Sequence, residues 1–225
     1  MKDARTIWKE WRGVIYFLFF MVMFRSAVAD WYLVPTGSMK PTILEGDYVL
    51  TNRLAYQLKL PFTDKVLAKW DAPKRGDIVV FDSPADGTRL VKRVVGLPGD
   101  TVAMIHNRVF INGQEVSYQS MSQDQASKVW PNHPPLLLEE TLGDVHHTVA
   151  VHDDRYSPYQ SFPERLIPQG QYFMMGDNRD NSGDSRIFGT VDSHLIAGRA
   201  KYILLSLDWG GNYLPRSGRS LTALQ

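Results

Sequence analysis

The hydrophobic and polar positions divide the chain into two regions. Residues 13–24 read GVIYFLFFMVMF and contain no charged side chain. A helix over this run would have no polar face, which disfavours a core helix of a water-soluble protein. After residue 33 the hydrophobic residues form short groups rich in β-branched and aromatic side chains, with Gly, Pro, Asn and Asp between them. Such groups are typical of strands, so the pattern predicts one apolar helix followed by an all-β domain.

The expected strands are short, and turn residues set their limits. They fall at residues 47–52, 77–82, 89–96, 101–105, 108–113, 114–118, 171–177 and 200–209. Asn112-Gly113 stands between two of these groups and indicates a two-residue hairpin turn. The spacing over residues 52–60 is the only weak indication of a further helix. Residues 119–168 differ in character, with clustered prolines and most of the histidines. We expect them to form a loop-rich insertion on the surface of the strand framework.

The flank before the apolar run carries more positive than negative charge. Its charged residues are Lys2, Arg5, Lys9 and Arg12 against Asp3 and Glu10. The positive-inside rule therefore places residues 1–12 in the cytoplasm as a short stub and residues 34–225 outside it. We favour residues 13–33 as a retained transmembrane anchor, although the apolar run is shorter than the about 20 residues that a bilayer core requires.

A second interpretation of the same segment is a cleaved secretory signal. Ala27-Val28-Ala29 resembles a small-x-small cleavage site, and the length of the apolar core fits. Arg25 fits a retained helix better, because its side chain can extend to the outer interface beside Trp31. We therefore expect that the site at residues 27–29 is not cut.

The composition excludes several kinds of chemistry. The formal net charge of +1 gives no sign of bulk electrostatic binding of nucleic acid. The chain has no cysteine, so disulfides, thiol nucleophiles and cysteine metal sites are absent. The histidines show no H-E-x-x-H spacing. We expect no metal and no other cofactor.

A serine loop follows the apolar segment directly. Residues 34–50 read VPTGSMKPTILEGDYVL, with Ser38 between a glycine and a methionine. In an extended segment Thr36 and Ser38 point to the same side. The Thr36 hydroxyl and the Ser38 backbone N–H would then make an oxyanion hole. Gly37 would allow a close approach of the backbone to a substrate. Taken alone, these residues also fit an ordinary turn.

Two residues are candidates for the base that a nucleophilic serine requires. His152, in VHDDR at residues 151–155, lies in the loop-rich region, where a solvated histidine is the ordinary case. Lys92 lies in the expected strand 89–96 and shares a face with Leu90 and Val94. Burial on such a face lowers the pKa of a lysine and makes the neutral amine available as a base. The same pattern also fits an exposed lysine on an edge strand. Neighbouring Arg93 has a similar pattern but could not serve as a base, because its guanidinium stays protonated.

Residues 175–189 form a third polar segment, MGDNRDNSGDSRIFG. If Gly183 takes position six of an EF-hand loop, position twelve falls on Gly189 instead of a glutamate, so the calcium interpretation fails. A tight loop tied by Asp–Arg pairs fits better and could hold a nearby lysine in place.

Three blocks in this order resemble the bacterial type I signal peptidases, or leader peptidases, which are serine-lysine endopeptidases. They are residues 35–50, residues 75–81 with 91–100, and residues 175–189. The resemblance implies that Ser38 is the nucleophile, that Lys92 is the general base and that Thr36 is the oxyanion hydroxyl. It also implies that Ser182 hydrogen-bonds the lysine amine. The remaining implied residues are the supporting ion pair Asp184 and Arg186, and the substrate pockets Val34, Pro35, Met39, Ile43, Leu90 and Val91.

The resemblance implies a function and a location. The expected activity is cleavage of N-terminal signal peptides from exported preproteins after small-x-small sites. The expected location is the bacterial inner (plasma) membrane, with a single pass, a cytoplasmic N-terminus and a periplasmic catalytic domain. Preproteins and the lipid bilayer would be the partners. Two alternatives stay open. One is a related protease with a single dedicated substrate, and the other is an anchored β-rich binding or scaffold protein with a catalytically inactive site. This chain has one apolar run, whereas many Gram-negative members of the family have two membrane spans. It also has no cysteine, whereas some members carry cysteines in the outer domain.

Overall fold

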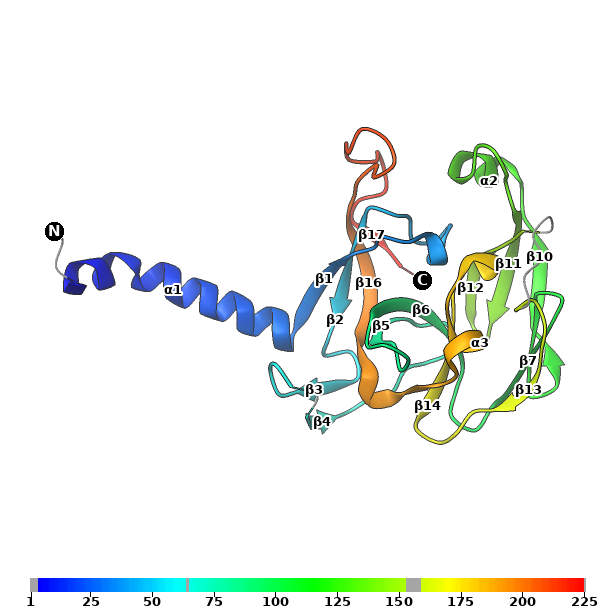
Figure 1. Cartoon of the computed structure of the whole chain (residues 1–225), viewed down its shortest axis with the longest axis horizontal. Coiled ribbons are helices and arrows are strands. Elements are labelled where there is room, and N and C mark those ends of the chain that lie inside the picture. Colours follow the sequence, from blue (N-terminus) through cyan, green and yellow to red (C-terminus); the bar gives the residue numbers. More distant parts are fainter. Residues whose placement is uncertain (1–3, 64, 153–158, 225) are drawn as a thin grey trace.

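The computed structural model describes residues 4–63, 65–152 and 159–224 (Figure 1). Helix α1, Ala4–Ala27, projects from one end of a β-rich body. None of the helices within these residues is both long and apolar enough to cross a membrane. The helix ends before the limit expected for the apolar segment, because residues 29–33 form a strand. That strand pairs with residues 48–52 and belongs to the body.

The main sheet has eight strands in the order β1-β2-β16-β5-β6-β14-β15, with β17 paired to β16. The bounds are β1 Ala29–Leu33, β2 Asp47–Asn52, β5 Ile78–Asp82, β6 Arg89–Gly96, β14 Gln171–Met175, β15 Val191–Asp192, β16 Ile196–Ser206 and β17 Thr222–Ala223. All of these pairings are antiparallel. The all-β prediction is confirmed, and the expected strands at residues 47–52 and 89–96 coincide with β2 and β6.

Three smaller sheets complete the strands of the described residues. They are β13-β7-β8-β9, β10-β11-β12 and β3-β4. Their bounds are β3 Gln57–Lys59, β4 Val66–Lys69, β7 Thr101–Ile105, β8 Arg108–Ile111, β9 Gln114–Glu115, β10 Ser117–Ser120, β11 Leu136–Leu142, β12 Val145–Val151 and β13 Phe162–Leu166. Asn112 and Gly113 have φ angles of 52° and 77°, as the predicted hairpin turn between β8 and β9 requires.

The remaining helices are one or two turns long. They are η1 Gly37–Met39, α2 Asp124–Val129, η2 Arg179–Asn181, α3 Ser185–Phe188 and η3 Ser193–Leu195. The weak helical spacing over residues 52–60 does not form a helix; the segment turns and enters β3 instead.

The prediction of a loop-rich insertion at residues 119–168 is wrong for much of that segment. β11 and β12 pair along their whole lengths, and α2 packs beside them through buried Ala126. The strands form because alternate apolar residues are buried on each face, with Leu137 in one cluster and Leu138 in another. The clustered prolines therefore indicate the connections between these strands and do not show that the whole of residues 119–168 is loop.

Candidate active site

The loop of the predicted nucleophile Ser38, named the nucleophile loop and comprising residues 34–46, connects β1 to β2 and carries Ser38 in the short helix η1. Thr36 precedes this helix in an extended conformation, with φ −126° and ψ 150°. Met39 and Ile43 are fully buried in the apolar cluster that contains Val34 and Val49. Ser38 therefore lies in the chain between two buried apolar residues, Val34 and Met39, with 8% of its surface exposed.

The segment after β14 holds the same loop from the other side. The backbone N–H of Asn178 donates to the Ser38 carbonyl at 3.1 Å, and its side-chain amide donates to the Gly37 carbonyl at 3.0 Å. Gly176 leaves room for this contact, because a Cβ there would lie 2.4 Å from the Ser38 carbonyl oxygen and 2.2 Å from the Ser182 hydroxyl oxygen. Only glycine fits at this position without displacing the nucleophile loop.

Lys92 meets Ser38 across the cleft between β6 and the nucleophile loop. Its Nζ lies 2.6 Å from Ser38 Oγ and 3.1 Å from the carbonyl oxygen of Val91. The side chain is inside the protein, with 2% of the residue exposed. The structure therefore brings together the two residues that the sequence predicted as nucleophile and base.

The surroundings of the Lys92 amine change its acidity. Burial lowers its pKa from 10.5 to about 8, while the carboxylates of Asp184 and Asp177 oppose the change. The Arg186 guanidinium adds to the lowering. At pH 7 about one amine in ten is then neutral, compared with about one in three thousand for an exposed lysine. A neutral amine at hydrogen-bond distance can accept the proton of the serine hydroxyl.

The predicted ion pair of Asp184 and Arg186 is present beside this site. Arg186 Nε and Nη2 lie 2.8 and 2.7 Å from the two carboxylate oxygens of Asp184. Asp184 also accepts from the Gly176 N–H at 3.0 Å and caps α3 through the Arg186 N–H. Burial acts to raise the pKa of Asp184, but Arg186 outweighs it and the pKa lies below its usual range. The pair therefore fixes the turn that carries Gly176.

The predicted hydrogen bond from Ser182 to the lysine amine is not formed. In the part of the chain that the structure describes, the buried Ser182 hydroxyl forms no hydrogen bond with Lys92; it lies near the Asp184 carboxylate, whose pKa it helps to lower. It packs over Gly176, while the Lys92 amine bonds the Val91 carbonyl. The spacing of the motif placed Ser182 in the right neighbourhood, but spacing does not determine the direction of a hydroxyl.

A cleft of about 360 Å³ leads away from Ser38 and Lys92. Of the predicted pocket residues, Val34, Pro35, Leu90 and Val91 line it, and so does Thr36. Met39 and Ile43 do not line it. Their side chains are buried in the core beneath the nucleophile loop, and Met39 is turned there by the short helix η1.

The far end of the cleft contains residues that sequence reasoning missed. Its walls there are Trp31, Tyr32, Thr88 and Arg89. Arg89 binds the Asp82 carboxylate at 2.6 and 3.2 Å and donates to the Tyr32 hydroxyl at 2.8 Å. Alternation along β1 was the available signal, because Tyr32 and Val34 both pack on the cluster beneath the cleft.

A second missed feature is the buried pair of Arg93 and Asp177. Two guanidinium nitrogens of Arg93 lie 2.9 and 2.8 Å from the Asp177 carboxylate. Thr42 of the nucleophile loop donates to the same carboxylate at 2.5 Å. The alternation of β6 explains this, because it directs Lys92 to Ser38 and Arg93 to the opposite side.

The alternative base, His152, does not line the cleft. Its ring stacks edge-to-face on Trp130, with 6.0 Å between ring centroids. Residues 153–155 of the same motif lie outside the described residues. No group of three or more potential ligand side chains (His, Cys, Asp or Glu) suited to a metal ion occurs within the described ranges.

Comparisons of the sequence with known proteins identify the family of the chain. A sequence profile described as signal peptidase, peptidase S26, matches residues 8–205. A signal peptidase I from Pseudomonas fluorescens is 38% identical over 205 aligned positions, covering 84% of this chain and 69% of that protein. One from Pseudomonas aeruginosa is 36% identical over 203 positions with the same coverage. A crystal structure of a signal peptidase I from Enterococcus faecalis shares 32% identity, covers 57% of this chain and 97% of that chain, and has a TM-score of 0.35. The chain belongs to the peptidase S26 family of signal peptidases.

Proposed function

We propose that this protein cleaves signal peptides from exported preproteins, with Ser38 as the nucleophile and Lys92 as the general base. The observation that carries the assignment of roles is the 2.6 Å contact between the buried Lys92 amine and the Ser38 hydroxyl. The membership of the peptidase S26 family supports the reaction class. The cleft that starts at these two residues supports a peptide substrate in an extended conformation.

The proposed reaction proceeds in two steps. The neutral Lys92 amine takes the proton of Ser38 Oγ as this oxygen attacks the scissile carbonyl carbon. The ammonium of Lys92 then gives the proton to the departing amine of the mature protein, which leaves an acyl-enzyme on Ser38. In the second step Lys92 takes a proton from water, the hydroxide attacks the ester, and Ser38 recovers its proton.

The tetrahedral intermediates of both steps carry a negative oxygen that needs donors. We assign the Thr36 hydroxyl and the backbone N–H of Ser38 to this role. Support comes from the position of Thr36, which lines the cleft and is exposed immediately before η1. An extended residue at this point can direct its hydroxyl along the same side as Ser38.

The cleft also suits small side chains one and three residues before the cut. An extended substrate places these two side chains on the same face, because side chains alternate along a strand. That face would meet Val34 and Val91 first and then Tyr32 and Arg89. Branched and long side chains on both walls leave little depth for a bulky substrate residue.

A processing assay tests the proposed substrate class. Purified full-length protein is incubated in detergent with a preprotein that bears an Ala-x-Ala site, and mass spectrometry reads the product N-terminus. We expect one cut directly after the second alanine. Replacing either alanine of the substrate by phenylalanine should abolish that cut. Equal cleavage of both forms, or no cleavage of several unrelated preproteins, would contradict the proposal.

We also propose that the protein acts at the bacterial inner membrane, with α1 in contact with lipid and the body on the outer side. Support comes from the large apolar side chains that α1 exposes, among them Phe17 at 65% and Phe20 at 69%. The net positive charge of residues 1–12, which precede the apolar run of residues 13–24, supports the direction. The specific expectation of a single membrane-spanning pass rests on the sequence pattern alone.

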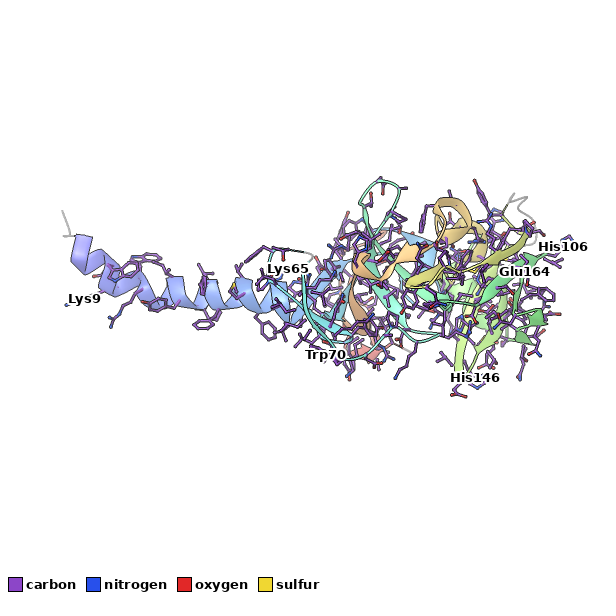
Figure 2. The ribbon with its side chains drawn as sticks, turned by 90° about the horizontal axis from the view of Figure 1, so that it is seen from below. Lys9, Lys65, Trp70, His106, His146 and Glu164 are labelled. Carbon is purple, nitrogen blue, oxygen red and sulfur yellow. The ribbon has the colours of Figure 1, made fainter. Side chains whose placement is uncertain are left out.

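The hairpin β3-β4 supports the same placement. It exposes Leu60, Phe62, Val66, Leu67 and Trp70. Its tip touches the end of α1, where the Phe62 N–H donates to the Ser26 hydroxyl at 3.0 Å. Figure 2 labels Lys65 and Trp70 at the end of the body that faces the helix. Apolar and aromatic side chains beside lysines are typical of segments that contact the bilayer surface.

A further inference from the structure

We infer that the wrapping segment, residues 207–224, positions the nucleophile loop for reaction. This segment follows β16 and lies beyond the residues 8–205 that the family profile matches. The inference rests on the proposed role of Ser38. It adds a set of positioning residues outside the motifs that carry the family resemblance.

The nucleophile loop needs such support because residues 34–46 lie between two strands and outside the sheet ladder. Backbone groups in a buried connection must find other partners. Two arginines of the wrapping segment supply them. Arg219 Nη2 donates to the Thr42 carbonyl at 2.8 Å, and Arg216 Nη1 donates to the Glu45 carbonyl at 3.0 Å.

The same two arginines share one buried carboxylate at the end of the loop. Asp47 is fully buried. Arg219 Nη2 lies 2.8 Å from Asp47 Oδ2, and Arg216 Nη1 lies 3.7 Å from Asp47 Oδ1. Asp47 Oδ2 also accepts from the Leu44 N–H at 2.8 Å. Removal of both arginines would leave a buried charge without its cationic partners, which is strongly destabilising locally.

The backbones of the two segments also touch. Gly46 has a φ angle of +90°, and a Cβ at this position would lie 2.3 Å from the Leu207 carbonyl oxygen. The Leu207 N–H donates to the Gly46 carbonyl at 3.0 Å. Farther along, β17 pairs with β16, and Leu224 packs on the cluster that contains Met39 and Ile43. The wrapping segment therefore contacts the loop through charges, backbone and apolar side chains.

A continuous set of contacts connects these supports to Ser38. The Ile43 N–H donates to the Met39 carbonyl at 2.9 Å, directly after the nucleophile. Thr42 donates to Asp177, and the next residue, Asn178, holds the Ser38 carbonyl. A shift of residues 42–47 thus changes the position of Ser38 relative to Lys92. Displacements of about 1 Å at a reacting group can reduce a rate by about 100-fold.

The test uses a double variant that carries both Arg216→Gln and Arg219→Gln. Its activity is compared with that of the wild type and of Arg165→Gln. Arg165 is an exposed arginine of β13 and serves as the matched control. In preprotein cleavage we expect the double variant to lose about tenfold or more in kcat, with KM within about twofold. The acid limb of its pH profile should move to higher pH, because a loosened loop admits water to the Lys92 amine. Arg165→Gln should match the wild type.

A second measurement keeps this inference separate from the proposed function. Backbone amide exchange of residues 39–47 should become faster in the double variant, whether or not the protein cleaves preproteins. Unchanged exchange with unchanged kcat would overturn the inference. A uniform loss of activity with an unmoved pH profile and a lowered melting temperature would show a merely structural role, and would overturn it too. Failure of the wild type to cleave, with faster exchange in the variant, would count against the proposed function alone.

Discussion

The acidity of the Lys92 amine gives a prediction that can be worked from the structure. The amine is a base only when it is neutral, and burial lowers its pKa from 10.5 to about 8. The neutral fraction at pH 7 is then about one tenth, which is about 300 times the fraction of an exposed lysine. The gain comes from the position of Lys92 inside the sheet, with 2% of the residue exposed.

The perturbation is therefore a change of pH between 5.5 and 9.5, with kcat/KM as the quantity measured. Because kcat/KM reports the ionisation of the free enzyme, it should fall by about tenfold per pH unit below the pKa of the base. The expected midpoint of this acid limb is about 8, where the Lys92 amine titrates. Above it, kcat/KM should reach a plateau.

The assay needs a substrate without groups that titrate in this range and a check that the protein stays folded at each pH. A peptide with an Ala-x-Ala site and blocked ends meets the first condition. A midpoint near 6.5 would indicate a histidine, and a kcat/KM that still rises about tenfold per pH unit at pH 9.5 would indicate an exposed lysine, whose pKa is about 10.4. Either result would refute the claim that a buried lysine is the base.

Three further predictions follow from the same geometry. Burial lowers the pKa of Lys92 in the folded state, so the free energy of unfolding of the wild type should increase as pH rises from about 8 to 10.5. In chemical denaturation at pH 7, Lys92→Met should be more stable than the wild type by about 3 kcal/mol, and this difference should disappear at the top of that pH range. A difference that stays constant with pH would contradict the prediction. Thr36→Val should lower kcat by about 100-fold or more with little change in KM. Thr36→Ser keeps the hydroxyl donor, so its kcat should stay near that of the wild type. An equal loss of kcat in both variants would exclude the hydroxyl as an oxyanion donor. Replacing both Phe62 and Leu67 by Asp should reduce flotation of the protein with anionic vesicles. Leu166→Asp, at an exposed apolar position on β13, should leave flotation unchanged. Equal flotation of the wild type and both variants would show that the hairpin does not contact the membrane.

The sequence predicted the framework of the fold because its strands are bounded by strong local signals. Alternation and turn residues located β2 and β6, and Asn112-Gly113 located one hairpin. The strands within residues 119–168 do not follow from proline content, because prolines mark connections and say nothing of the buried strands between them. The helical run was extended too far, because hydropathy alone does not separate the end of α1 from β1.

The candidate site could be predicted as far as residue types and periodicity determine it. Periodicity placed Lys92 among aliphatic neighbours on one face of a strand, and the resemblance to the signal peptidases supplied its role and the ion pair Asp184–Arg186. Three-dimensional details did not follow. A local helix turns Met39 into the core, and a glycine beneath Ser182 determines where its hydroxyl rests. The contacts of the wrapping segment with the nucleophile loop join residues more than 160 positions apart, and no local pattern reports them.

The pairing of Ser38 with Lys92 is the central claim, and a set of matched variants tests it most directly. The measurement is the rate of cleavage of an Ala-x-Ala preprotein by the wild type, Ser38→Ala, Lys92→Ala and Lys92→Arg, at equal amounts of folded protein. Lys40→Ala is the control, since Lys40 lies two residues after the nucleophile and pairs with Glu45 at 2.7 Å. We expect cleavage by the wild type and Lys40→Ala, and a loss of at least about 1,000-fold in the other three. Activity that survives in Lys92→Ala and disappears in His152→Ala would contradict the account and identify the histidine as the base.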